Sequence, residues 1–280
     1  MNHEEGTLLT DDGLDLYWQA WEPPGSPEGV LFFVHGLGEH SGRYDNPVRY
    51  FVARGWTCFA IDYRGHGQSP GPRVHVNSFD ELLSDVSEGH RLARIRYPDT
   101  EVFLVGHSQG GLLTLLYAES NPDHLAGAIV SSPFLGIHPD SRPSALLTGA
   151  SRFASRLTPK LMFSTDLDPN LLSRDVEVVQ AYIEDPLVSS RVSARWATSA
   201  ADAQRRALTE ASLLTVPTLV MQAGADRLVD PEATRTWVAS APDDLVEYVE
   251  WDGCFHELFN EQLLDRRKVF DSMERWLGKQ

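Results

Sequence analysis

Apolar runs alternate with amphipathic segments along much of the chain. The runs Val30–Val34, Trp56–Ile61 and Val102–Val105 have the pattern of strands that are covered on both faces. From Ser78, apolar residues recur at helical spacing, and Ser78 and Glu81 have the spacing of a capping box. This alternation predicts the α/β fold class, with a mostly parallel sheet and helices on both of its faces.

The outer parts of the chain continue the alternation. A turn at Asp12-Gly13 precedes residues 14–21, which are rich in strand-favouring side chains and predict an early antiparallel hairpin. Further elements are predicted as strands over Leu125–Ser131, Val216–Met221 and Leu245–Trp251, a helix from Pro231, and a final amphipathic helix. The sequence contains no repeat or second independent unit, so residues 1–280 are predicted to form a single domain.

The alternation breaks between about residues 134 and 202, where prolines, serines and short apolar clusters take its place. We expect this segment to be an insertion that forms a helical cap above the sheet. A stripe of apolar residues in it shares one helical face: Leu146, Leu147, Ala150, Phe153, Ala154 and Leu157. The stripe has three interpretations, which are packing on the domain, lining an acyl pocket, and transient contact with a lipid surface.

The composition narrows the classes of partner. With 280 residues, 42% of them hydrophobic, the chain has enough apolar surface for a sizeable core. A net charge of −16 argues against nucleic acid, and against an anionic membrane held by charge, because both need clustered Lys and Arg. The first residues lack the pattern of a signal peptide, so we expect a cytoplasmic protein. Cys58 and Cys254 are expected to be core thiols without a metal or redox role.

One strand-to-helix junction suggests where the chemistry lies. The strand Val102–Val105 turns directly into a helix at Ser108, within a Gly-x-Ser-x-Gly motif whose glycines, Gly106 and Gly110, let strand and helix approach closely. The hydroxyl of Ser108 is then held out of the sheet. The backbone N–H of Gln109 points to the place where an ester carbonyl would develop negative charge. The motif alone leaves a second interpretation open, in which Ser108 only caps the helix.

An acid and a base follow the serine in an order known from serine hydrolysis. His256 is the only histidine in the second half of the chain, and it lies in a loop after a predicted strand. Asp226 follows the strand 216–221, so a loop at the carboxyl end of that strand would present it. Asp230 is its rival, but an aspartate before Pro231 is typical of a helix N-cap, which explains Asp230 sufficiently.

A second oxyanion donor is expected in the glycine-bearing loop after the strand Val30–Val34, and we nominate the N–H of Leu37. Other histidines have simpler explanations. His107 is expected to pack or to orient the nucleophile loop, and His66 and His75 to form hydrogen bonds in loops. A nucleophile, acid, base and two oxyanion donors in a consistent order favour nucleophilic catalysis over a helix cap.

Six segments spread over nearly the whole chain carry a family resemblance: residues 35–44 (HGLGEHSGRY), 62–69 (DYRGHGQS), 106–111 (GHSQGG), 185–187 (DPL), 225–228 (ADRL) and 256–258 (HEL). In these segments the sequence resembles the monoacylglycerol lipases and lysophospholipases of the α/β-hydrolase family. The resemblance implies a catalytic triad of Ser108, Asp226 and His256, with oxyanion N–H groups from Leu37 and Gln109. It also implies a helical cap over an apolar acyl tunnel.

The resemblance further implies that Glu39, Arg43 and His107 lie near a polar pocket for the glycerol end of the substrate. One position departs from the family pattern, because relatives usually have methionine or leucine where this chain has Gln109. The oxyanion donor at this position is a backbone group, so we expect the oxyanion hole to survive the change. An effect of the side chain is expected on substrate preference instead.

The implied reaction is the hydrolysis of a small amphiphilic carboxylic ester, most specifically a monoacylglycerol, through an acyl-enzyme and without a metal or organic cofactor. Three other functions remain open on the residues alone. The same triad serves a general carboxylesterase or lysophospholipase, and it serves a serine aminopeptidase. A binding protein on a hydrolase fold is the non-catalytic alternative.

Overall fold

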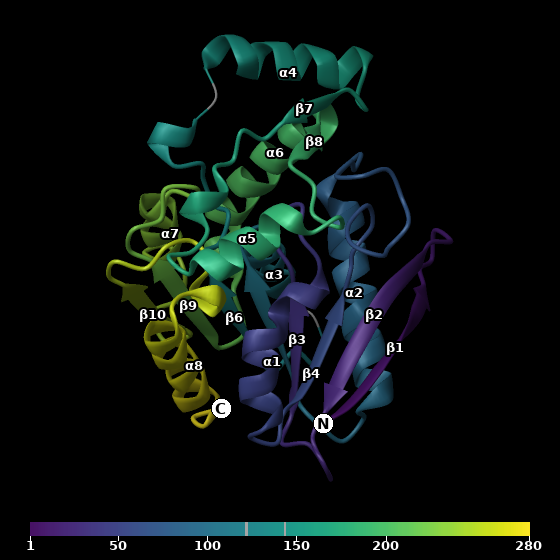
Figure 1. The fold of residues 1–280 in the computed structure, drawn as a ribbon, viewed down its shortest axis with the longest axis vertical. Coiled ribbons are helices and arrows are strands. Elements are labelled where there is room, and N and C mark those ends of the chain that lie inside the picture. Colours follow the sequence, from purple (N-terminus) through teal and green to yellow (C-terminus); the bar gives the residue numbers. More distant parts are fainter. Residues whose placement is uncertain (121–122, 143) are drawn as a thin grey trace.

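The computed structural model describes residues 1–120, 123–142 and 144–280. Its central feature is a sheet in which eight strands of the described residues follow the order β1-β2-β4-β3-β5-β6-β9-β10 (Figure 1). The strands are β1 (Asn2–Leu9), β2 (Asp15–Glu22), β3 (Val30–Val34), β4 (Thr57–Ile61), β5 (Val102–His107), β6 (Gly127–Ser131), β9 (Thr218–Ala223) and β10 (Val246–Trp251). β2 pairs antiparallel with β1, as the predicted hairpin requires, and also with β4, whereas the other neighbours are parallel.

Helices cover both faces of this sheet. They are α1 (Asp45–Val52), α2 (Phe79–Arg96), α3 (Gln109–Glu119), α6 (Ala194–Glu210), α7 (Pro231–Val238) and α8 (Leu263–Leu277). Successive side chains of a strand point to opposite faces. In β3, therefore, Phe32 joins the core under α2, α3 and α6, and Phe33 joins the core with α1 and α8. Both phenylalanines are buried, which explains the unbroken apolar run in the sequence.

The start of α2 differs in detail from the capping box that the sequence predicts. Ser78 is the N-cap, and its hydroxyl accepts a hydrogen bond from the Asp80 N–H at 3.1 Å. The carboxylate of Glu81 reaches one residue further back than expected and accepts from the Asn77 N–H at 3.1 Å. The helix still begins at the predicted place, because the side chains of Ser78 and Glu81 each accept a hydrogen bond from a backbone N–H group near its start.

The segment predicted to be a cap lies beyond the carboxyl ends of the strands (Figure 1). Its elements are α4 (Ala145–Leu157), a small antiparallel sheet of β7 (Met162–Ser164) and β8 (Arg191–Ser193), α5 (Val176–Glu184) and the first turns of α6. α4 packs on α6. α6 continues to Glu210 and also packs against α3, so one continuous helix joins the cap to the main layer.

Among the described side chains of the apolar stripe in the cap, one is buried and others are exposed to solvent. Ala154 is buried, but Leu146, Phe153 and Leu157 are 84%, 68% and 66% exposed, and Ala150 is exposed as well. The sixth member of the stripe, Leu147, lies outside the side chains that the structure describes. Packing on the domain therefore accounts for one residue of the stripe, and the three large side chains face outward.

Two further expectations concern the whole chain. Cys58 and Cys254 are buried free thiols, as the sequence predicts. Among the described residues, no helix combines the length and the apolar composition that crossing a membrane requires.

Candidate active site

Ser108 lies at the sharp turn between β5 and α3. Its backbone has φ 53° and ψ −117°, a conformation that is strained for a residue with a Cβ atom. The surrounding backbone holds it there, because the Ser108 N–H donates to Ser131 O at 3.0 Å and its carbonyl accepts from Leu112 and Phe134. Ser108 is partly exposed, whereas both neighbours in the chain are buried. The turn therefore presents the hydroxyl, as the elbow motif predicts.

The two glycines of the motif are required by close backbone contacts. A Cβ atom on Gly106 would lie 2.3 Å from the carbonyl oxygen of Gly110. A Cβ atom on Gly110 would lie only 1.9 Å from the carbonyl oxygen of Val34, at the end of the neighbouring strand. No side chain fits at these distances, so the glycines let β5 and α3 meet at the angle that exposes Ser108.

His256 and Asp226 form a buried pair in the loops after β10 and β9. The Nδ1 atom of His256 lies 2.7 Å from Oδ2 of Asp226, and both residues are 3% exposed. Burial alone would lower the pKa of His256, but the Asp226 carboxylate outweighs burial and raises it. The other oxygen of Asp226 accepts from the N–H groups of Leu228 and Val229. The carboxylate is thus fixed on one side and orients the imidazole with the other.

Asp230 is the N-cap of α7, as the sequence predicts. Its carboxylate caps α7 by accepting from the Glu232 N–H at 3.1 Å, and Pro231 occupies the first helical position. The second oxygen pairs with Arg142 at 2.9 Å. Both carboxylate oxygens of Asp230 have partners outside the His256 pair.

The loop after β3 passes beside the nucleophile. A Cβ atom on Gly36 would lie 3.3 Å from the Cβ atom of Ser108. Within the described part of the chain, neither the Leu37 N–H nor the Gln109 N–H donates to another protein group. These two N–H groups, one on the loop and one at the start of α3, are therefore available as the donors that an oxyanion needs.

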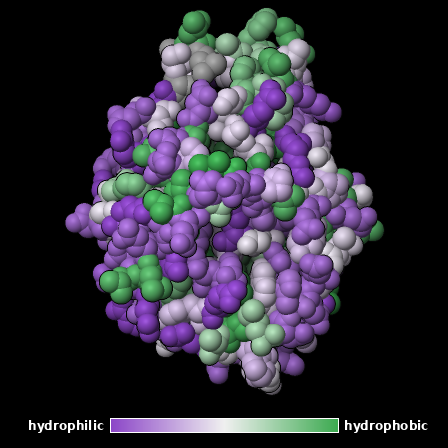
Figure 2. All heavy atoms as spheres, in the orientation of Figure 1, coloured by the Kyte–Doolittle hydropathy of each residue, from purple (hydrophilic) through white to green (hydrophobic). Residues whose placement is uncertain are grey.

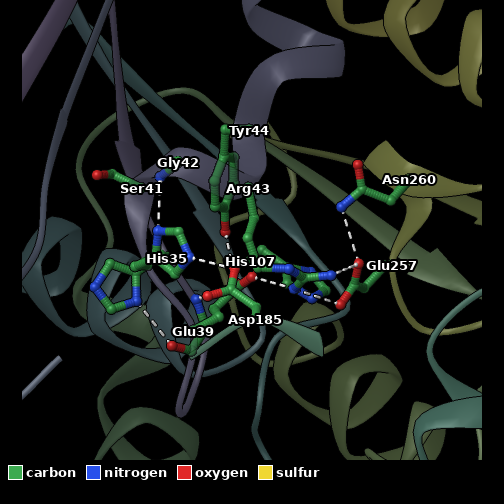
Figure 3. A network of polar contacts seen from close by, with 12 residues as sticks. His35, Glu39, Ser41, Gly42, Arg43, Tyr44, His107, Asp185, Glu257 and Asn260 are labelled. Atoms are coloured by element: carbon green, nitrogen blue, oxygen red, sulfur yellow. Dashed lines mark hydrogen bonds and ion pairs between the residues drawn. The ribbon is translucent and has the colours of Figure 1, made fainter. Parts of the chain in front are cut away.

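Of the three residues assigned to a polar pocket, Glu39 and His107 are buried and Arg43 is largely buried. Glu39 and Arg43 belong to one ionic network (Figure 3). Nη1 of Arg43 contacts Oε2 of Glu39 at 2.5 Å, and its guanidinium binds both oxygens of Glu257 at 2.8 and 2.9 Å. Burial would raise the pKa of Glu39, but Arg43 outweighs burial and lowers it to about 2. Oε1 of Glu39 also accepts from the Gly36 N–H at 2.5 Å and from the Tyr44 hydroxyl at 3.0 Å. The network therefore supports the loop that carries Leu37.

His107 packs beside the buried pair. Its ring centre lies 4.7 Å from that of His256, and its Nδ1 atom lies 3.2 Å from Ser131 O. Burial, together with the nearby His256, lowers the pKa of His107 to about 4, so the ring is neutral at neutral pH. A neutral, packed ring fits the orienting role that the sequence suggests.

The motif at residues 185–187 contacts the same loop from the cap. Asp185 lies 2.8 Å from Nε2 of His40. Four residues further on, the Ser189 N–H donates to Gly38 O at 2.8 Å. Two segments that are about 145 residues apart in the chain therefore hold each other.

Sequence reasoning missed two features of the site. Glu257 is the second partner of Arg43, and its only signal in the sequence is its place directly after His256. The side chain of Gln109 is fully buried and contacts Tyr63 and Trp196, although the sequence suggests a role for its backbone only. The unusual residue type at this position was the available signal.

Comparison with known proteins agrees with this geometry. The family model described as "Serine aminopeptidase, S33" matches residues 25–263. The chain belongs to this family of α/β-hydrolases. It is 31% identical over 272 residues to the monoglyceride lipase of Rattus norvegicus, which covers 97% of this chain and 89% of the relative. It is also 34% identical over 248 residues to phospholipase YtpA of Bacillus subtilis, covering 87% of this chain and 93% of the relative.

Solved structures also include a monoacylglycerol lipase that resembles this chain. The monoacylglycerol lipase of Paleococcus ferrophilus superposes with a TM-score of 0.83 at 35% identity, covering 94% of this chain and 98% of that chain. The fold is therefore the α/β-hydrolase fold that the resemblance implies. This α/β-hydrolase is a serine ester hydrolase of the monoglyceride lipase group.

Proposed function

We propose that this α/β-hydrolase cleaves monoacylglycerols to a fatty acid and glycerol through an acyl-enzyme on Ser108. One observation carries the proposal: a strained, partly exposed serine and a buried His256–Asp226 pair occur in a chain that aligns with monoglyceride lipases over 97% of its length. The alignment favours a monoacyl substrate, and the site supplies the groups for ester cleavage.

In the proposed mechanism the hydroxyl oxygen of Ser108 attacks the ester carbonyl while Nε2 of His256 takes the hydroxyl proton. Asp226 holds the tautomer with Nε2 free and stabilises the imidazolium that forms. The N–H groups of Leu37 and Gln109 stabilise the negative oxygen of the tetrahedral intermediate. His256 then gives the proton to the leaving glycerol oxygen as the ester C–O bond breaks. Water repeats the sequence on the acyl-enzyme and releases the fatty acid.

We assign the glycerol end of the substrate to the polar groups of Glu39, Arg43 and His107. A guanidinium has five N–H donors, and Arg43 makes three hydrogen bonds to carboxylates, so donors remain for a substrate hydroxyl. Removing Arg43 would leave two carboxylates buried side by side. The informative variant is therefore Arg43→Lys, which keeps the charge and loses the paired contact with Glu257.

A panel of esters tests the proposed function. We expect kcat/KM for monoacylglycerols to rise about fourfold with each added methylene until the acyl site is filled, because each contributes roughly 0.8 kcal/mol. A monoacylglycerol should exceed the methyl ester of the same chain, and triacylglycerol should be poor. Arg43→Lys should reduce the ratio of kcat/KM for the monoacylglycerol to kcat/KM for the methyl ester. The rate on the methyl ester itself should stay unchanged and serves as the internal control.

Three results of this panel would count against the proposal. A flat dependence on chain length would indicate a general carboxylesterase. Faster cleavage of an aminoacyl amide than of any ester would indicate an aminopeptidase, in keeping with the wording of the family description. Faster cleavage of a lysophospholipid than of the matching monoacylglycerol would indicate a lysophospholipase, the second candidate, which the similarity to phospholipase YtpA favours.

We also propose that the cap contacts lipid surfaces transiently through α4. Leu146, Phe153 and Leu157 are 84%, 68% and 66% exposed on this helix. Hydrophobic groups gather at the top of Figure 2, where Figure 1 places α4. Large apolar side chains that face water at the end of the molecule are suited to insertion into a lipid interface.

The cap proposal predicts an effect that depends on how the substrate is presented. Phe153→Ser should lower the rate on monoacylglycerol in zwitterionic vesicles about tenfold, since an inserted aromatic side chain contributes on the order of 1.5–3 kcal/mol. The rate on a soluble short-chain ester should stay unchanged. Leu264→Ser on α8 is the matched control, because Leu264 is 74% exposed but lies outside the cap. An equal loss on both substrates would contradict the proposal.

A further inference from the structure

The side chain of Gln109 connects two elements that meet above the sheet. It is fully buried, and its Oε1 atom accepts from Nε1 of Trp196 at 2.8 Å. Its Nε2 atom donates to the hydroxyl of Tyr63, also at 2.8 Å. An indole nitrogen only donates, so the amide has one orientation, with its oxygen toward Trp196 and its NH₂ group toward Tyr63. The same residue supplies one of the two proposed oxyanion N–H groups through its backbone.

Tyr63 passes this contact on to the loop after β3. Its oxygen accepts from Gln109, so its single proton is available to the loop carbonyls, which lie at 2.8 Å for Gly36 O and 3.1 Å for His35 O. Burial raises the pKa of Tyr63 far above its usual value, so the hydroxyl keeps this proton. The Tyr63 ring also stacks on the His35 ring, with centres 3.8 Å apart.

The carbonyl of Gly36 and the N–H of Leu37 belong to one peptide group. Because a peptide group is planar and trans, a hydrogen bond that fixes the direction of its carbonyl also fixes the direction of its N–H. Tyr63 holds that carbonyl, and Nδ1 of His35 lies 2.8 Å from the same oxygen. On the preceding peptide, the Gly36 N–H is held by Glu39. Tyr63 is therefore one of the groups that set the direction of the Leu37 N–H.

The far end of this chain of contacts belongs to the cap. Trp196 lies in the first turn of α6, 6% exposed, with its ring near Phe79 and Phe134. Ser193 caps the helix by accepting from the Trp196 N–H at 3.1 Å. A shift of the start of α6 would move the indole and hence the Gln109 amide.

We propose that Trp196, Gln109 and Tyr63 are positioning residues that couple the seating of α6 to the direction of the Leu37 N–H. The inference rests on the proposed function, because it concerns the oxyanion hole of that reaction, and it deepens that function by linking cap position to turnover. An apolar side chain of similar size would fill the space of Gln109 without any cost of burying an amide. The amide matters, in this proposal, for the reaction rather than for the fold.

Three variants remove one contact each: Gln109→Met, Tyr63→Phe and Trp196→Phe. We expect kcat to fall roughly 10- to 100-fold in each, below the 10²–10³ that deleting an oxyanion donor costs, because the donor is misdirected and not lost. KM should change less than about twofold, since ground-state binding does not use the oxyanion hole. Matched controls are Trp237→Phe and Tyr117→Phe, which delete hydrogen bonds to Glu119 and His90 outside the site.

A trifluoromethyl ketone with the acyl chain of the substrate gives a readout that packing alone would not move. Its adduct with the active-site serine carries an oxyanion, so its Ki should weaken in each variant by the same factor as kcat falls. A product fatty acid, which forms no oxyanion, should bind as in wild type. Circular dichroism and melting temperature identify any variant that fails to fold, and if Tyr63→Phe is one, the other two decide the matter.

A double-mutant cycle tests whether the residues act as one chain. Gln109→Met combined with Tyr63→Phe should be no slower than the slower single variant, because either change already disconnects the loop from α6. Multiplying effects, unchanged Ki for the ketone, or losses no larger than those of the two controls would overturn the coupling. Labelling of wild type by a fluorophosphonate probe separates the two hypotheses. No labelling at Ser108 would refute the proposed function, whereas normal labelling with unaffected variants would refute only the coupling.

Discussion

Replacing Ser108 by alanine is expected to abolish ester hydrolysis, lowering kcat by about 10⁶ if this site behaves like other serine triads. The hydroxyl of Ser108 is the only nucleophile at the turn between β5 and α3, and the remaining groups have no covalent route to the acyl-enzyme. The fold should persist, because alanine and serine both carry a Cβ atom and so pay a similar strain at φ 53°.

Purified Ser108→Ala and wild type should be compared on a monoacylglycerol and with the fluorophosphonate probe. The control is the melting temperature of both proteins, which we expect to agree closely. Retention of more than about a hundredth of the wild-type kcat would mean that another residue is the nucleophile, because the oxyanion hole alone does not supply such a rate.

The second large effect is expected at the acid. Asp226→Asn should lower kcat by about 10⁴, because an asparagine in this position donates to Nδ1 of His256 and selects the tautomer that cannot accept the serine proton. The pKa of His256 should also fall, since burial lowers it and the carboxylate that now outweighs burial is removed. The acid limb of the residual activity should move to lower pH accordingly.

Asp230→Asn is the matched control. Asparagine caps helices about as well as aspartate, so α7 should keep its start, and the lost ion pair with the exposed Arg142 contributes little. We expect kcat within about twofold of wild type, because Asp230 touches neither His256 nor its loop. If Asp230→Asn were the more damaging of the two in kcat with the melting temperature preserved, Asp226 would not be the acid.

Local sequence patterns were sufficient for the elements and for the order of the reactive groups. Apolar runs such as Val30–Val34 mark strands buried on both faces, and the structure contains β3 at those residues. The Gly-x-Ser-x-Gly motif is a pattern of neighbouring residues, so the sharp turn was predictable, although contacts with Ser131 and Phe134 help to hold it. The task of Asp230 was predictable for the same reason, since a helix cap contacts only the residues that follow it.

Contacts between distant segments were outside the reach of such patterns. Glu39 and Arg43 carry charges that a loop normally exposes, but the approach of Glu257, more than two hundred residues away, joins them in one network. The three large side chains of the α4 stripe show the reverse case, because a helical face suited to packing finds no covering element among the described residues.

The sequence by itself determined which residues are the candidates for the chemistry: a serine at a strand-to-helix turn, an aspartate and a histidine after later strands, and a glycine-bearing loop after β3. The sequence was sufficient here because each of these features is a motif of neighbouring residues. Tertiary structure alone decided how those groups are held. The side chain of Gln109 links Trp196 of the cap to Tyr63 and the loop after β3 only because α6, α3 and the loop after β4 meet at one buried point. No local pattern encodes such a meeting, since Tyr63 and Trp196 lie 46 and 87 residues from Gln109 in the chain.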